Sequence, residues 1–216
     1  MEFERRRHSP THLTTIVTDP AEFYARDPQS TDLVSAALIV LATAVASTLG
    51  TLYAMSLVLG RFPSTVRAFA FLGSAVSILS GLFGTVLVWI AVSGTFYLLS
   101  AAFTDTGEFR DLVAAVGWGF VPALFSALLG SGAAIYVFSQ LSLPTVGDGI
   151  AATLRSAGDH PLIVFANALG VAFTLWQGVI WFFAIKHVRA LSAREAALTV
   201  AGPVGVSAVW TLQSLL

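Results

Sequence analysis

The stretch Leu33–Gly60, LVSAALIVLATAVASTLGTLYAMSLVLG, contains no charged residue between Asp32 and Arg61. A bilayer core about 30 Å thick is crossed by roughly 20 helical residues at 1.5 Å each, so this stretch is long enough to span a membrane. It also lacks the single apolar stripe that is typical of a helix on the surface of a soluble protein. The stretch therefore predicts a membrane-spanning helix.

Four more gaps between charged residues are long enough to span: Ala68–Thr104, Leu112–Gly147, Pro161–Ile185 and Ala196–Leu216. Two crossings and a turn would need more than about 40 residues, so each gap is expected to hold one helix. We predict an all-α, polytopic membrane helix bundle with about five transmembrane helices, at residues 34–59, 74–101, 113–139, 161–185 and 196–216. Pro122 and Pro203 fall inside two of these spans and predict kinks there.

The composition of the 216 residues supports this class, because 56% are hydrophobic and only 11% are charged, against about 25% charged in soluble domains. There is no cysteine, which excludes disulfides, thiolate metal sites and thiol catalysis. The net charge of −1 gives no field that would attract nucleic acid, so no nucleic-acid partner is expected. The basic residues are ten Arg and one Lys, a skew typical of GC-rich or halophilic genomes.

None of the five predicted spans contains Asp, Glu, Lys, Arg or His. Coupled transporters usually place such groups inside the membrane, and hydrolases need a base beside their nucleophile, so both classes are disfavoured. No catalytic, cofactor or metal site is predicted, and we expect a protein that is not an enzyme. A channel or permease for a small neutral solute stays open as the alternative, with Asn167 and Gln177 as its polar candidates.

The chain divides into an N-terminal segment, residues 1–32, and a membrane domain, residues 33–216. Within the segment, Asp19-Pro20-Ala21-Glu22 predicts a helix start with a capping box. The apolar face of this region has two possible positions, on the cytoplasmic membrane surface or packed on the bundle. That face consists of Leu13, Ile16, Val17, Phe23 and Tyr24. A further short interfacial helix is predicted near residues 150–156.

Lysines and arginines in the connections predict the orientation, because they are enriched on the cytoplasmic side. Eight lie on the side of the N-terminus: Arg5, Arg6, Arg7, Arg26, Arg110, Lys186, Arg189 and Arg194. Three lie on the other side: Arg61, Arg67 and Arg155. The N-terminus is therefore expected in the cytoplasm and the C-terminus outside.

Small residues repeat every four positions on three of the predicted spans, which lets helix backbones approach closely. These sets are Ser77, Gly81 and Thr85; Gly170, Thr174 and Gly178; and Ala197, Ala201 and Gly205. They are expected to serve packing within the bundle or, less commonly, contact with other membrane proteins or a second copy. The charged turn at residues 105–111, centred on Gly107, is a solvated turn or a recognition surface.

The order of several short motifs resembles the Yip family of membrane proteins, named for interaction with Ypt/Rab GTPases. These motifs are Pro20-Ala21-Glu22-Phe23-Tyr24, Gly94-Thr95-Phe96-Tyr97-Leu98-Leu99, Phe109-Arg110-Asp111-Leu112, Gly117-Trp118-Gly119-Phe120-Val121-Pro122, Leu175-Trp176 and Leu191-Ser192-Ala193-Arg194-Glu195-Ala196-Ala197. The positions that we expect to serve packing or partner contact are Pro20, Phe23, Tyr24, Gly107, Phe109, Arg110, Gly117, Gly119, Pro122, Gly170, Thr174 and Gly178.

The resemblance implies a five-helix membrane domain with a cytoplasmic N-terminus, in agreement with the charge distribution. It also implies a role in membrane organisation, since eukaryotic relatives act in vesicle trafficking. The N-terminal segment lacks the Asp-Leu-Tyr-Gly-Pro element of those relatives, which weakens the expectation of direct GTPase contact. A prokaryotic cell membrane is the expected location, and the lipid bilayer is the expected partner.

A reporter fused after Leu216 tests the predicted topology. An odd number of crossings from a cytoplasmic N-terminus places that reporter outside, where alkaline phosphatase is active and green fluorescent protein is dark. Cytoplasmic fluorescence from the fusion would contradict either the helix count or the orientation.

Overall fold

The computed structural model describes residues 12–26, 32–60, 63–142 and 148–213, and the regular structure in these ranges is entirely helical. In chain order the helices are α1 His12–Thr18, α2 Pro20–Arg26, α3 Leu33–Leu59, α4 Ser64–Ser100, α5 Phe109–Trp118, α6 Val121–Ser139, α7 Asp148–Gly158, α8 Pro161–Val188 and α9 Ala193–Gln213. The predicted all-α bundle is confirmed.

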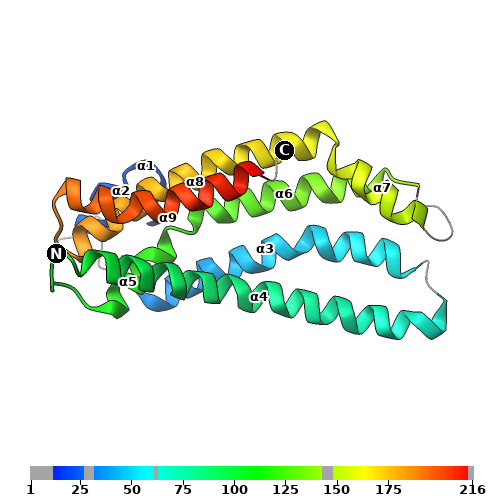
Figure 1. Cartoon of the computed structure of the whole chain (residues 1–216), viewed down its shortest axis with the longest axis horizontal. Helices are drawn as coiled ribbons and strands as arrows, with labels where there is room; N and C mark the ends of the chain where they lie inside the picture. The colour runs from blue at the N-terminus through cyan, green and yellow to red at the C-terminus, as the bar shows by residue number, and fades with distance from the viewer. Residues whose placement is uncertain (1–11, 27–31, 61–62, 143–147, 214–216) are drawn as a thin grey trace, which may run out of the picture.

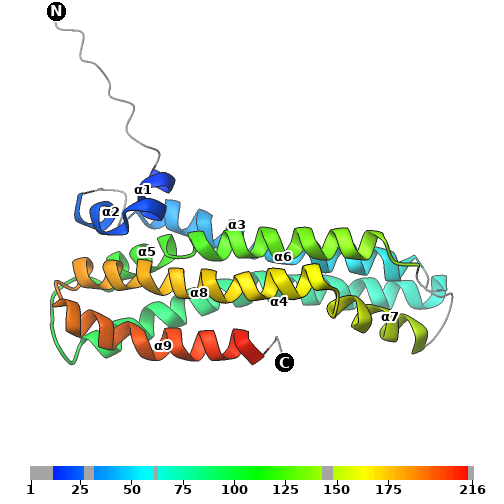
Figure 2. The ribbon, with the colours of Figure 1, turned by 90° about the horizontal axis from the view of Figure 1, so that it is seen from above.

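The long helices lie side by side in an elongated bundle, and successive helices run in opposite directions (Figure 1). α3 packs against α4, α5 and α6, whereas α8 packs against α6 and α9. One end of the bundle carries α1, α2 and α5, and we call it the α5 end. The opposite end carries α7, and we call it the α7 end (Figure 2).

Four stretches of helix are long and apolar enough to cross a membrane: Leu33–Leu59, Arg67–Ser100, Phe109–Ser139 and Pro161–Val188. The chain is thus a multi-pass membrane protein. The fifth predicted span corresponds to α9, whose 21 residues extend over about 31 Å. α9 lies along the bundle against α8, and it contains Pro203.

The second predicted span, residues 74–101, lies almost wholly within α4, which begins ten residues earlier, at Ser64, and ends at Ser100. Pro63 immediately precedes that first residue, and its fixed φ of −54° suits a helix start. The 37 residues of α4 extend over about 55 Å, well beyond a bilayer core of about 30 Å. A helix in a membrane protein does not have to end where the hydrocarbon ends.

The predicted third span is two helices rather than one kinked helix. α5 ends at Trp118 and α6 begins at Val121, so Gly119 and Phe120 separate them. Pro122 lies in the first turn of α6, where a missing N–H leaves no bond unmade. The proline therefore begins a helix here instead of bending one.

The N-terminal helices pack on the bundle, which is one of the two positions left open by the sequence. Ile16 and Phe23 are fully buried, whereas Leu13 stays 53% exposed. Asp19 Oδ1 accepts a hydrogen bond from the Glu22 N–H at 2.9 Å, as predicted for a helix start. The other half of the predicted capping box is absent, because Glu22 pairs with Arg26 and the Asp19 N–H donates to Thr15 O.

Large buried side chains gather at the α5 end, where α2, α5 and the adjoining turns of α3, α4, α8 and α9 form one cluster. Packing nearer the α7 end relies on small residues. A Cβ atom on Gly50 of α3 would lie 3.1 Å from Ala134 Cβ of α6, and Ser131 Oγ donates to Ala46 O across the same contact at 2.6 Å. The two ends of the bundle are therefore built differently.

Asp32 begins α3 and provides a test of the helix start. Its carboxylate accepts hydrogen bonds from Val34 N and Ser35 N, both at 3.2 Å. Hydrogen bonds from the Ser35 side chain and backbone lower the pKa of the Asp32 carboxyl. Because the pKa of Asp32 is lowered in the folded state, its ionised carboxylate stabilises the fold at pH values above the ordinary aspartate pKa, near 4. This stabilisation is lost as the pH falls through the lowered pKa of the folded state.

The substitution Asp32→Ala should therefore lower the melting temperature near neutral pH, and the difference from wild type should shrink below about pH 4. Circular dichroism of the full chain in detergent micelles measures the melting temperatures of the variant and of the wild type at each pH. Asp105→Ala, in an exposed turn, is the control. A difference for Asp32→Ala that does not change with pH would contradict the capping role.

Candidate functional site

The break between α5 and α6 lies in the most buried part of the chain, since every residue from Leu112 to Pro122 is buried. Gly119 N donates to Val116 O and Phe120 N donates to Gly117 O, both at 3.0 Å, so the last turn of α5 is tightened. A helix end leaves carbonyl oxygens without partners in the helix. Because water does not reach this helix end, other groups must supply hydrogen bonds.

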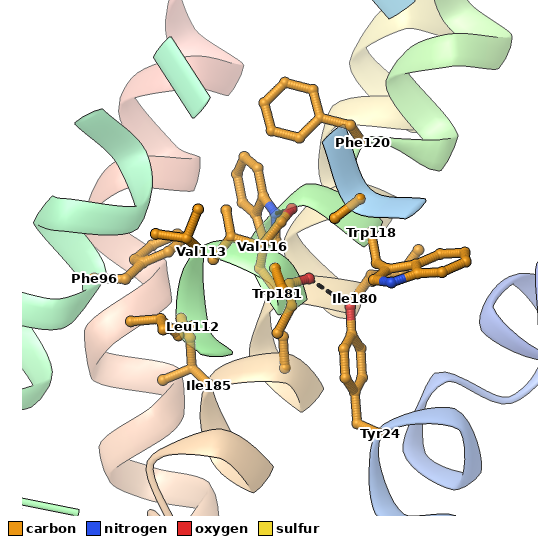
Figure 3. Packing of buried hydrophobic residues seen from close by; sticks show 14 of the residues in the cluster. Tyr24, Phe96, Leu112, Val113, Val116, Trp118, Phe120, Ile180, Trp181 and Ile185 are labelled. Carbon is orange, nitrogen blue, oxygen red and sulfur yellow. Dashed lines mark hydrogen bonds between the residues drawn. The ribbon is translucent and has the colours of Figure 1, made fainter. Parts of the chain in front are cut away.

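Three side chains from three other helices donate hydrogen bonds to carbonyl oxygens of α5. Trp89 Nε1 of α4 donates to Val113 O at 2.9 Å. Tyr24 Oη of α2 donates to Ala115 O at 2.8 Å, a bond drawn in Figure 3. Trp181 Nε1 of α8 donates to Val116 O at 3.0 Å. These bonds attach α2, α4 and α8 to the same short helix.

Two glycines let the indole rings reach the backbone. A Cβ atom on Gly119 would overlap Trp181 Nε1. A Cβ atom on Gly117 would lie 2.8 Å from Ala36 Cβ and 3.0 Å from Trp89 Nε1. The contacts of a Cβ atom with Trp181 and with Ala36 are shorter than non-bonded contacts allow, and the one with Trp89 is tighter than most, so each glycine is needed for the close approach of its neighbours.

Aromatic contacts attach α2 to α5 beside these hydrogen bonds. The rings of Phe23 and Trp118 meet edge to face with centroids 5.1 Å apart, and Figure 3 shows Trp118 close to Tyr24. Burial raises the pKa of the Tyr24 hydroxyl well above its ordinary value, so the group stays protonated and keeps its donor. Pro20, the first residue of α2, is half-buried.

A buried arginine forms a second polar centre at the α5 end. Arg189 follows α8 and is 1% exposed. Its guanidinium donates to Ser100 Oγ at 2.9 Å and to the carbonyl oxygens of Thr104 and Gly107, each at 2.9 Å. It also donates to Thr106 O and lies 4.4 Å from the centroid of the Tyr97 ring. One side chain thus holds the whole turn between α4 and α5.

The turn and the end of α8 fit each other closely. Gly107 has a φ of +82°, and a Cβ atom there would collide with Val188 O. α8 ends with a left-handed residue, Ala190 at φ 50°. The Leu191 N–H then bonds Lys186 O at 3.0 Å, which is the pattern of a Schellman ending. Gly107 is therefore required by both backbone conformation and space.

Several side chains of the turn remain exposed although its backbone is held. We call them the turn surface: Phe103, Asp105, Glu108, Phe109 and Arg110. The Phe109 ring is 41% exposed and meets Tyr97 edge to face at 5.4 Å. The turn surface combines apolar, acidic and basic groups on one ordered loop.

The small residues of α8 serve packing inside the chain. Thr174 Oγ1 donates to Gly170 O of its own helix at 2.9 Å. A Cβ atom on Gly178 would lie 2.8 Å from Val204 Cγ1 of α9. This face therefore holds α9 at Gly178, one turn before Trp181.

The predicted candidate residues fall into three groups. Phe23, Tyr24, Gly117, Gly119 and Pro122 come together at the break, with Pro20 at the edge of that cluster. Gly107, Phe109 and Arg110 belong to the turn, whereas Gly170, Thr174 and Gly178 lie on α8. Sequence reasoning missed Trp89, Trp181 and Arg189. An indole N–H within an apolar helix needs an acceptor, which is the signal that points to the two tryptophans.

Comparisons with known proteins indicate the family of the chain. A family model, the Yip1 domain, matches residues 14–214. An uncharacterized protein of Methanocaldococcus jannaschii is 24% identical over 127 residues, which cover 58% of this chain and 90% of that protein. No solved structure matches the chain significantly. Among the described residues there is also no group of three His, Cys, Asp or Glu that could hold a metal ion.

The tryptophan bonds to the α5 carbonyls can be tested with Trp181→Phe. The variant keeps a large ring but removes the indole donor, while Val116 O still accepts the Gly119 N–H. The free energy of unfolding should therefore fall by the net contribution of one hydrogen bond, about 0.5–1.5 kcal/mol. Denaturation of the full chain in mixed micelles, followed by circular dichroism, measures this free energy.

The matched control is Trp176→Phe on the same helix. The Trp176 ring stacks on Phe173, and its indole N–H bonds no residue in the part of the chain that the structure describes. The control should cost clearly less than Trp181→Phe. Equal losses in the two variants would show that the N–H bond contributes nothing beyond ring volume.

Proposed function

Because the chain belongs to the Yip1 domain family, we propose that it is a non-enzymatic membrane-organising protein that acts as a scaffold. In this proposal the α5 end faces the cytoplasm of a prokaryotic cell and binds a protein partner, while the C-terminus lies outside. The distribution of lysine and arginine supports this orientation.

The observation that carries the proposal is the hold of Arg189 on the turn between α4 and α5. A solvated turn needs no anchor, and burying a cation among neutral acceptors is costly unless its donors are satisfied. Here the donors bond Ser100 Oγ and three carbonyl oxygens. Ordering a loop before binding removes part of the entropy cost of association, which is a reason to build such an anchor.

The chemistry of the turn surface favours a protein over a lipid headgroup. Phe103 and Phe109 are 43% and 41% exposed and offer apolar anchors. Asp105 and Glu108 would repel anionic headgroups, whereas Arg110 offers a donor for a carboxylate. Aromatic anchors with charged neighbours are typical of protein interfaces. The proposal does not require that partner to be a GTPase.

The alternative, a channel or permease for a small neutral solute, has weaker support. Asn167 lines a cavity at the α7 end, but Gln177 is not among the residues around that cavity. Gln177 is 9% exposed and lies ten residues, about 15 Å, further along α8. The two amides therefore do not share one described cavity.

Crosslinking in native membranes tests the scaffold proposal. A photoreactive amino acid at Glu108 should capture a reproducible protein neighbour, identified by mass spectrometry, because it sits on the turn surface. The same amino acid at Leu87 of α4, which is 68% exposed, should capture lipid instead. Phe109→Ala should reduce the yield at Glu108 several-fold while the melting temperature stays close to wild type, since one exposed side chain is removed.

The variant Arg189→Met provides a second measurement. It removes the anchor of the turn, so the crosslink yield at Glu108 should fall even where circular dichroism shows an intact helix bundle. A Glu108 position that captures only lipid, or the same proteins as Leu87, would contradict the proposal.

A further inference from the structure

A cavity of about 500 Å³ opens between α3, α6, α7 and α8, near the α7 end. Its walls are made largely of small residues, among them Gly50 of α3 and Gly130 of α6. Leu154 and Gly158 of α7 form part of its lining, and Asn167 of α8 contributes an amide. Pockets of a few hundred Å³ are of the size that holds a small organic molecule or part of a lipid.

Thr51 and Asn167 are the polar side chains of this cavity whose groups bond no other residue in the described part of the chain, and the amide of Asn167 is the larger of the two. Ser47 Oγ donates to Ala44 O at 2.8 Å, and Ser131 Oγ donates to Ala46 O at 2.6 Å, so both hydroxyl protons are used. No hydrogen bond joins the Asn167 amide to another residue in the part of the chain that the structure describes. An amide offers two donors and one acceptor, and leaving them unpaired in an apolar medium is unfavourable.

The depth of Asn167 indicates which molecule can reach it. α8 has 28 residues, about 42 Å, so about 6 Å extends beyond a 30 Å core at each end when the helix is centred. Asn167 lies six residues after Pro161, about 9 Å along the axis, and hence about 3 Å inside the hydrocarbon. This is the level at which the glycerol region of a lipid meets its chains.

We propose that this cavity binds one bilayer lipid. A neutral hydroxyl or carbonyl oxygen close to the lipid's glycerol forms a hydrogen bond with the Asn167 amide. One acyl chain of the lipid lies along the small residues of α3 and α6. Water alone fits the site poorly, because about 500 Å³ equals the liquid volume of more than ten waters, at about 30 Å³ each. The walls offer few groups that would bind so many.

A second copy of the chain is also a poor occupant. α7 lies beside the cavity, and Leu154 and Gly158 supply part of the lining. A neighbouring helix that ran along the bundle would therefore meet α7 before it filled the space. A flexible lipid chain can enter between α7 and the bundle, since α7 has few contacts with helices other than α8.

Photolabelling of the full chain in phosphatidylcholine nanodiscs tests the inference. The probe is a phosphatidylcholine with a diazirine near the glycerol end of one chain. Label should concentrate on the α3, α6 and α8 peptides around the cavity, as read by mass spectrometry. Asn167→Leu should lower the apparent affinity of the probe on the order of tenfold, which corresponds to the loss of one hydrogen bond.

Two glycine substitutions form a matched pair. A Cβ atom on Gly130 meets nothing within 4 Å, so Gly130→Leu fills the cavity without pressing on the backbone. Gly84 of α4 is equally open and lies away from the cavity, so Gly84→Leu is the control. Gly130→Leu should remove most of the label at the cavity, whereas Gly84→Leu should keep that label. The two variants should have the same melting temperature.

Equal labelling of the two variants would overturn the inference, as would label spread over outward residues such as Phe83 with none at the cavity. Crosslinked dimers through Asn167 would also overturn it, because a second copy would then be the occupant. These outcomes leave the scaffold proposal untouched, since that proposal concerns the turn surface at the opposite end.

Discussion

A carbonyl oxygen that is buried away from water must accept a hydrogen bond, and the break between α5 and α6 places several such oxygens in the centre of the fold. The Tyr24 hydroxyl donates to Ala115 O, the Trp89 indole donates to Val113 O, and the Trp181 indole adds a second bond to Val116 O, which also accepts the Gly119 N–H. Because each donor comes from a different helix, the same requirement brings α2, α4 and α8 to one place. The glycines on either side of Trp118, the aromatic contacts and the dense cluster at this end all follow from that arrangement.

The parts of the fold that the sequence predicts best are those controlled by local apolar length. Leu33–Leu59 and Pro161–Val188 lie within three residues of the predicted spans at both ends, because a bilayer demands a minimum run of apolar residues. The sequence predicts a kink at Pro122, whereas the structure has a break at Gly119 and Phe120, since a proline in a helix pattern is compatible with either outcome. Arg189 was expected to lie at the cytoplasmic surface as an orienting charge. Its burial depends on acceptors more than 80 residues away in sequence, and no local pattern contains that information.

The bundle has two different ends. At the α5 end, large aromatic and aliphatic side chains fill the interior and hydrogen bonds fix the connections. At the α7 end, small residues bring α3 and α6 together and leave a cavity with one free amide. Small residues that permit close helix contact also leave space where that contact ends. The same small residues thus produce tight packing in one place and a cavity of about 500 Å³ near it.

The long-range bonds of the α5 end also set the order in which the chain can mature during synthesis. Tyr24 leaves the ribosome long before its acceptor Ala115, and the turn at residues 104–107 waits for Arg189. Until α8 has entered the membrane, α5 lacks the Trp181 donor and the turn lacks its anchor. A chain interrupted before α8 therefore lacks these donors, and its turn between α4 and α5 has no anchor. The contacts that shape the finished α5 end are thus completed only when α8 is in place.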